Sequence, residues 1–138
     1  MERGEPDRRQ RLPESRARPS RQGHQSGRDA DVGYYFIGNQ FARFKRMTAD
    51  NIDLEKTWFL IETLLETGRV KYVLMDYDIQ RVFYDYLAPV YPDWRLAQYF
   101  QYPRPRSSNA GVIRHAPRHA DHLHVRFHCP IDDERCVE

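Results

Sequence analysis

The run from His122 to Phe127 alternates polar and apolar side chains, and this alternation restricts the fold more than any other feature of the sequence. Successive side chains of a β-strand point to opposite faces of the sheet. The polar set is His122, His124 and Arg126, and the apolar set is Leu123, Val125 and Phe127. The apolar face can pack on a core, which leaves two imidazoles directed together into a cleft. The sequence therefore predicts a sheet that carries histidines on one face.

The remaining segments alternate between strand-like and helix-like patterns. Further strands are expected at residues 31–37, 71–75 and 111–114, and helices at 51–66, 79–87 and 94–100. In the first helix the apolar positions recur at helical spacing, a polar lead supplies caps, and Gly68 follows as a C-cap glycine. The aromatic residues of the helices are assigned to the core. This order predicts an α+β domain with helices packed on a mostly antiparallel central sheet.

Composition limits the chain to one domain with a core of moderate size. It has 138 residues, of which 40% are hydrophobic and 13% aromatic. A net charge of +2 gives no strong field for nucleic acid, and no apolar run approaches membrane-spanning length.

The beginning of the sequence differs from the rest. Residues 1–20 are rich in Arg, Pro, Ser and Glu, so we expect a disordered leader ahead of a folded domain at 21–138. This leader lacks the apolar stretch of a secretory signal. If the protein is exported, either Met1 is not the native start or export uses another route.

The six histidines are unevenly placed. Five crowd into residues 115–128, whereas His24 stands alone with Asp31 seven positions later. Imidazole and carboxylate groups are the ligands that zinc takes in sites with one position left open for water. A His-x-His strand alone is a moderate signal, and a distant His-x6-Asp strengthens it. The two segments together predict a metal site assembled by the fold, which points to an enzyme.

Several residues have alternative interpretations. Asp29 could replace Asp31 as a ligand, since both can share a strand face. His115 is expected to form hydrogen bonds at the cleft rim or in the sheet rather than to bind a metal, and it could instead orient a ligand. Arg126 is expected to form a structural ion pair rather than to bind substrate. His128 is left unassigned. The two cysteines either pair in an oxidising compartment or remain free thiols.

Two motifs resemble those of the penicillin-insensitive murein endopeptidases. Residues 24–36 (HQSGRDADVGYYF) resemble the first metal motif of that family, and residues 119–127 (HADHLHVRF) resemble the second, His-x-x-His-x-His. The tail from Cys129 to Cys136 is similar to a disulfide-bonded loop of the family, and the likeness spans roughly residues 22–138. The resemblance implies a fold of the hedgehog and D-Ala-D-Ala-peptidase type. It also implies a periplasmic or extracellular zinc hydrolase that cuts the D-alanyl–meso-diaminopimelyl cross-link of peptidoglycan.

Carried over residue by residue, the resemblance implies three zinc ligands, His24, Asp31 and His124, with His122 and His119 as the catalytic histidines beside the metal. It also implies a Cys129–Cys136 disulfide. Three protein ligands leave a fourth position for water, whose pKa zinc lowers from about 15.7 to about 7. His122 can then take the proton of that water and pass it to the leaving amine. His119 could share this duty or stabilise the oxyanion, and the sequence does not decide between them.

Some positions depart from the family pattern. Gly23 and Arg21 stand where many relatives have a serine and a further histidine, and relatives usually have more ordered chain before the first motif. Two other functions therefore stay open. One is a related D-Ala-D-Ala carboxypeptidase or dipeptidase, in which Asp121 would occupy the position of a glutamate base. The other is a catalytically silent, truncated metal-binding cell-wall module.

Overall fold

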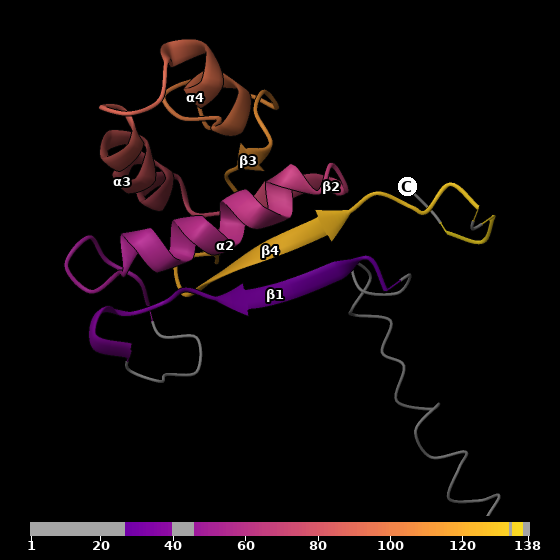
Figure 1. Cartoon of the computed structure of the whole chain (residues 1–138), viewed down its shortest axis with the longest axis horizontal. Helices are drawn as coiled ribbons and strands as arrows, with labels where there is room; N and C mark the ends of the chain where they lie inside the picture. The colour runs from indigo at the N-terminus through magenta and orange to yellow at the C-terminus, as the bar shows by residue number, and fades with distance from the viewer. Residues whose placement is uncertain (1–26, 40–45, 133, 137–138) are drawn as a thin grey trace, which may run out of the picture.

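The computed structural model describes residues 27–39, 46–132 and 134–136. The expected disordered leader and His24 therefore lie outside the described residues. Figure 1 shows the elements in chain order. They are β1 (Asp29–Gly33), the 3-10 helix η2 (Ile37–Asn39), α2 (Leu54–Glu66), β2 (Val70–Leu74), α3 (Tyr77–Leu87), α4 (Asp93–Tyr99), β3 (Ile113–Arg114) and β4 (His122–Phe127).

The four strands form one mixed sheet in the order β1-β4-β2-β3. The last strand in the sequence, β4, is central and runs antiparallel to both β1 and β2, whereas β3 pairs parallel with β2. The register sets Asp31 opposite His124 and Gly33 opposite His122. Strands joined to helices in this order give an α+β architecture, as the sequence predicted. The fold thus brings two segments 93 residues apart side by side.

The caps of α2 explain where this helix begins and ends. The Asp53 side chain accepts a hydrogen bond from the Lys56 backbone N–H, so Asp53 is the N-cap. The sequence predicted a start at Asn51, but Asn51 belongs to a turn in which its amide N–H bonds the Thr48 carbonyl. At the other end Gly68 has φ +73°, which suits the residue that follows a helix C-cap. The predicted C-cap glycine is confirmed.

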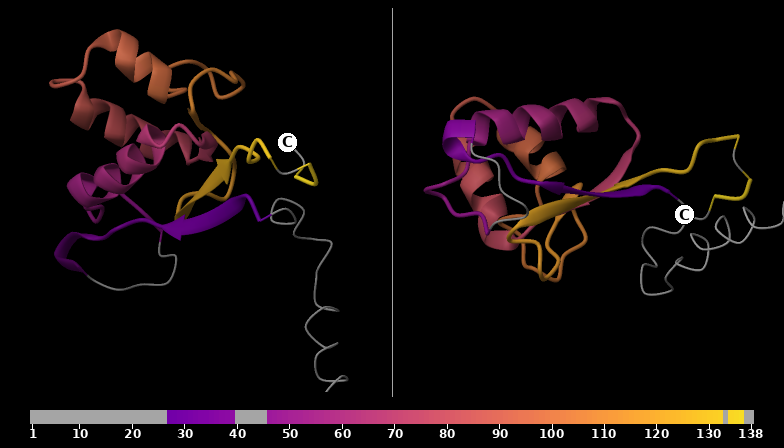
Figure 2. Two further views of the ribbon diagram at one scale, coloured as in Figure 1. Left: turned by 45° about the vertical axis from the view of Figure 1, so that its right-hand side comes forward. Right: turned by 90° about the horizontal axis from the view of Figure 1, so that it is seen from below.

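The core lies between the helices and the apolar face of β4. Figure 2 shows α2 lying across the β1–β4 pair. Leu123 and Val125 are buried together with residues of α2, α3 and α4, as the alternating pattern predicted. Trp58 of α2 stacks on Phe100 with ring centroids 5.7 Å apart. The polar face of β4 is therefore the face left for chemistry.

Two aromatic residues that the sequence assigned to the core are exposed. Tyr86 is 42% exposed and Trp94 is 66% exposed. Tyr86 lies on α3 three residues after buried Phe83, but it is not among the residues of the core. The short α4 buries only Leu96 within its bounds, so its first turn stays outside the core. Helical spacing located these helices, but it assigned more of their aromatic side chains to the core than the structure buries.

The strand predicted at residues 31–37 is shorter than expected. β1 ends at Gly33, and the next residues leave β4 to contact the segment before α2. The Asp53 amide donates to the Tyr35 carbonyl, and Phe36 forms an isolated bridge with Ile52. Tyr34 and Phe36 are buried by this change of partner. The chain therefore bends sharply just beyond the residues of the candidate site.

Candidate functional site

The polar faces of β1 and β4 bring together one carboxylate and two imidazoles. Asp31 Oδ1 lies 2.9 Å from Nδ1 of His124 and 3.8 Å from Nε2 of His122. The cross-strand register produces this arrangement, since Asp31 is the direct partner of His124. Of the three predicted ligands, Asp31 and His124 therefore converge. Whether His24 joins them lies outside the described residues.

A second carboxylate holds the other side of the His124 ring. Asp29 Oδ1 lies 2.7 Å from His124 Nε2, and Asp29 Oδ2 accepts a hydrogen bond of 2.8 Å from Arg126. The Asp29 side chain is fully buried. Both of its oxygens are thus engaged within the protein, which favours Asp31 over Asp29 as the carboxylate that faces a metal. The structural ion pair expected of Arg126 is present.

His122 forms a dyad with its neighbour in sequence. Its Nδ1 lies 2.6 Å from Asp121 Oδ1. A carboxylate only accepts hydrogen bonds, so this ring nitrogen carries the proton. The other nitrogen, Nε2, faces Asp31. The contact with Asp121 thus assigns Nε2 as the proton-accepting nitrogen, on the side of the candidate ligand Asp31.

His119 completes the group of rings from the loop before β4. Its ring centroid lies 4.9 Å from that of His122 and 6.2 Å from that of His124. Its Nδ1 lies 2.8 Å from the Pro117 carbonyl, to which it donates a hydrogen bond. Burial lowers the pKa of His119, and neighbouring His122 and His124 add to this effect, while the bond to Pro117 opposes it. His119 is thereby favoured as a neutral ring.

Backbone hydrogen bonds fix the loop that carries His119. The buried Tyr34 hydroxyl donates to the His119 carbonyl at 2.9 Å, and the Met47 amide donates to the Ala120 carbonyl at 2.6 Å. Burial raises the pKa of Tyr34, and the charges of Asp76 and Asp121 raise it further. No pattern in the sequence indicates this role of Tyr34, because the contact joins a side chain to a backbone atom 85 residues away.

His115 is placed by hydrogen bonds beside the loop of residues 102–110. Its Nδ1 accepts from the Tyr77 amide at 3.1 Å, and its own amide donates to Gln101 Oε1 at 2.6 Å. The buried Gln101 also donates to three carbonyls of that loop, those of Pro105, Arg106 and Ser108. The hydrogen-bonding role expected of His115 is confirmed. Gln101 was missed, since nothing in its sequence neighbourhood distinguishes it.

The remaining predicted residues lie away from the rings. His128 is exposed after the end of β4, and its amide donates to the Arg69 carbonyl. Cys129 and Cys136 form a disulfide with a Cα–Cα distance of 5.6 Å, which confirms the expected pairing. The rings of His119 and His122 therefore lie near the start of β4, and the disulfide follows its end.

The donor atoms at Asp31 and His124 fit a zinc ion in part. Within the described ranges, no group of three His, Cys, Asp or Glu residues has the arrangement to hold a metal. Two ligand atoms of a tetrahedral zinc site lie about 3.3 Å apart when the bonds are about 2.0–2.1 Å long. The 2.9 Å between Asp31 Oδ1 and His124 Nδ1 is close to that spacing. Both ring nitrogens of His124 face carboxylates, Nε2 at 2.7 Å from Asp29 and Nδ1 at 2.9 Å from Asp31, so a zinc ion at Nδ1 would take the place of a proton there.

No protein-family model matches this chain, and no curated protein and no solved structure matches it. In the described part of the chain, no helix is both long and apolar enough to cross a membrane.

Proposed function

We propose that this protein is a zinc-dependent peptidoglycan DD-endopeptidase that hydrolyses the D-alanyl–meso-diaminopimelyl cross-link, with a hedgehog and D-Ala-D-Ala-peptidase type of fold and a periplasmic or extracellular location. The observation that carries the proposal is the meeting of Asp31 and His124, with buried Asp29 behind the ring. A ring held between a buried carboxylate and a second, partly exposed one resembles the carboxylate–histidine pairs that support zinc sites.

The residues proposed to hold zinc are His24, Asp31 and His124. When bound there, zinc supplies Lewis acidity and lowers the pKa of a water from about 15.7 to about 7. Asp29 keeps the proton of His124 on Nε2, which leaves Nδ1 as the donor atom. Arg126 is the ionic partner of the buried Asp29 carboxylate and holds it beside His124.

The proton transfers are assigned to His122. Asp121 accepts from Nδ1 and favours the tautomer in which Nε2 is the base. Nε2 faces Asp31, so a water placed beside that carboxylate lies within reach of the base. His122 takes the proton of the attacking water and passes it to the amine that leaves. His119, a neutral ring 4.9 Å away, donates to Pro117 through Nδ1, so its other nitrogen is an acceptor that can share this transfer. To donate to the developing oxyanion, His119 would first have to take up a proton.

The contact between Asp121 and His122 supports the endopeptidase over a D-Ala-D-Ala carboxypeptidase. In the latter, the residue at position 121 would itself be the base. Here its carboxylate is bonded to His122 at 2.6 Å, and the imidazole is the group left facing Asp31. Hydrolysis of a cross-linked muropeptide dimer compared with a D-Ala-D-Ala peptide separates the two activities.

The experiment combines metal analysis with muropeptide digestion. We expect about one zinc ion per chain and release of monomers from cross-linked dimers by the wild type. His122→Ala should retain zinc and lose at least 100-fold of the hydrolysis rate. His128→Ala is the matched control, since that histidine lies beyond the end of β4 and should leave the rate unchanged. A chain that fails to retain zinc, or a His122→Ala variant as active as wild type, would contradict the proposal.

A further inference from the structure

Arg118, directly before His119, has an unusual backbone conformation. Its φ is +68°, and it is the one non-glycine residue with a positive φ in residues 27–39, 46–132 and 134–136. An L-residue with a Cβ is disfavoured in this left-handed region, which glycine and, to a lesser degree, asparagine adopt readily. A costly conformation at the edge of a candidate site directs attention to what the side chain does there.

The Arg118 side chain is exposed and makes no hydrogen bond, ion pair or ring contact with the described residues. Three other arginines differ in this respect. Arg126 binds Asp29, Arg106 lies 3.7 Å from Asp78, and Arg114 donates to the Gly111 carbonyl. No structural interaction therefore accounts for a guanidinium at position 118. What remains is solvent or a ligand.

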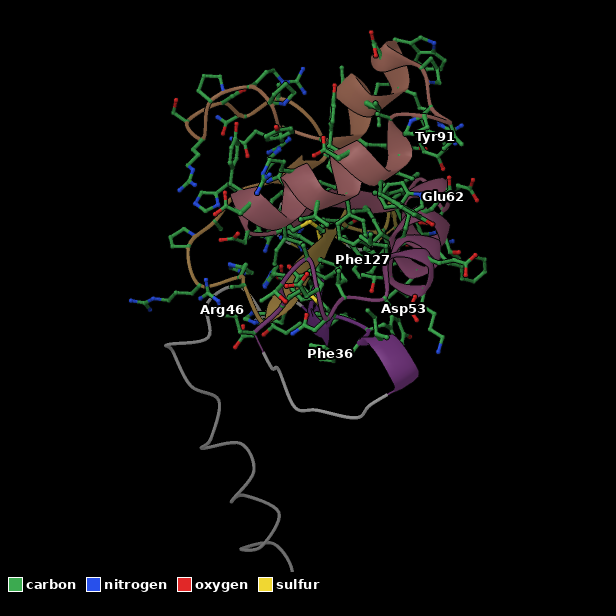
Figure 3. The ribbon with its side chains drawn as sticks, turned by 90° about the vertical axis from the view of Figure 1, so that its left-hand side faces the viewer. Phe36, Arg46, Asp53, Glu62, Tyr91 and Phe127 are labelled. Carbon is green, nitrogen blue, oxygen red and sulfur yellow. A yellow bond between two sulfur atoms is a disulfide. The ribbon has the colours of Figure 1, made fainter. Side chains whose placement is uncertain are left out.

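A second guanidinium flanks the same loop. The Met47 amide donates to the Ala120 carbonyl, which places the exposed Arg46 beside the segment that carries His119. Figure 3 shows Arg46 on the side of the molecule opposite Glu62 and Tyr91. Two exposed arginines are thus carried by backbone segments that flank His119, whereas Asp31 and Asp121 of the candidate site are acidic.

We propose that Arg118, assisted by Arg46, binds a free carboxylate of the substrate next to the bond that is cut. This inference rests on the proposed function and adds a specificity determinant to it. In a D-alanyl–meso-diaminopimelyl bond, the carbon attached to the leaving nitrogen also carries a carboxylate. Asp31 and Asp121 would repel that group, and a guanidinium offers it two parallel hydrogen bonds.

The test compares two cross-linked peptides that differ only in this carboxylate, which is free in one and a carboxamide in the other. Arg118→Asn removes the charge with a residue that tolerates a positive φ, and Arg118→Lys keeps the charge. We expect Arg118→Asn to lower kcat/KM at least tenfold on the free acid and less than twofold on the carboxamide. Arg118→Lys should lie between the wild type and Arg118→Asn. Arg81→Gln, an exposed arginine of α3, is the control and should change neither value.

A binding measurement separates this inference from the proposed function. The probe is the reduced-amide analogue of the dipeptide, as free acid and as carboxamide, titrated by calorimetry. Preference of the wild type for the acid, lost in Arg118→Asn, supports the inference even if no hydrolysis is found. The inference would be overturned if the wild type bound acid and carboxamide equally, or bound neither. It would also be overturned if Arg118→Asn lowered kcat/KM equally on both peptides. An unchanged unfolding midpoint in Arg118→Asn shows that any loss does not come from unfolding.

Discussion

At the scale of single residues, Asp29 has the most demanding position in the candidate site. Its side chain is fully buried, and its two oxygens contact His124 and Arg126. A buried carboxylate is costly unless it is paired, so its retention here needs both partners. This pairing holds the Nε2 side of the His124 ring.

Asp29→Asn tests this dependence. The amide still accepts from His124 but presents an N–H group to Arg126, which loses its ionic partner. We expect zinc affinity to fall about 10- to 100-fold, and the free energy of unfolding to fall by about 1–3 kcal/mol. Competition with a chromogenic chelator and urea unfolding measure the two effects. Asp85→Asn, at an exposed position of α3, is the control, and equal zinc affinity in both variants would contradict the role of Asp29.

Tyr34 gives a prediction for the pH dependence of stability. Burial raises its pKa, so the folded state resists ionisation of this phenol while the unfolded chain ionises near pH 10. The contribution of Tyr34 to stability is therefore complete below about pH 10 and is lost as the pH rises further. At pH 8, Tyr34→Phe should lose about 1 kcal/mol with the bond to the His119 carbonyl.

Above about pH 10, the difference in the free energy of unfolding between wild type and Tyr34→Phe should shrink. It should do so by at most about 1.4 kcal/mol for each pH unit. Urea unfolding between pH 8 and 11 measures the difference. Tyr35→Phe removes the neighbouring phenol, which is 45% exposed, and should differ from the wild type by the same small amount across this range. A Tyr34→Phe difference that does not change with pH would contradict the prediction.

The residues that the sequence could identify are those whose signal is local. The bounds of β4 and the separation of its two faces follow from alternation within six residues. The meeting of the two segments was expected from their metal-ligating residue types, and the particular pair of Asp31 and His124 was expected from the resemblance between motifs. Tyr34 and Gln101 act on backbone atoms of distant loops, and a side chain that donates to a carbonyl requires no particular residue type there. Such contacts leave no pattern in a single sequence.

At the scale of elements, the short β3 is explained by the close approach of two backbones. Gly111 has φ +84°, and a Cβ at this position would lie 2.6 Å from the Phe100 carbonyl carbon. The glycine lets the chain return from α4 and pass against Phe100 and Gln101 before it pairs with β2. The sequence predicted a strand from this residue onward, but pairing begins only at Ile113.

Gly111→Ala should therefore be strongly destabilising. The added methyl group meets backbone atoms, which cannot move aside as a flexible side chain can, and the positive φ adds strain. We expect the free energy of unfolding to fall by about 2–5 kcal/mol. Gly68→Ala is the matched control, since it shares the positive φ but has nothing within 4 Å of the added atom. Its loss should be about 1–2 kcal/mol, and equal losses in the two variants would show that the close approach is unimportant.

At the scale of the whole molecule, β4 connects two regions with separate roles. Its first residue, His122, belongs to the group of rings, and the disulfide begins two residues after its last residue. Six residues of strand span about 20 Å. The disulfide joins two cysteines that are seven positions apart in the C-terminal tail. It therefore does not hold together the strands that carry the site.

Removing the disulfide should thus affect stability without affecting chemistry. In the chain-entropy model, closing a loop of this length contributes about 2 kcal/mol to the free energy of unfolding. This is the largest loss of stability expected for the double variant Cys129→Ser, Cys136→Ser. Zinc affinity and the hydrolysis rate of the folded variant should equal those of the wild type. The reason is that β1 pairs with β4 through residues 29–33 and 122–126, all of which precede the disulfide-bonded segment. Unfolding by urea and muropeptide digestion at a temperature where the variant is folded measure the two quantities. If the folded variant lost activity, the tail would have to contact the substrate or the rings, and the separation of roles along β4 would be wrong.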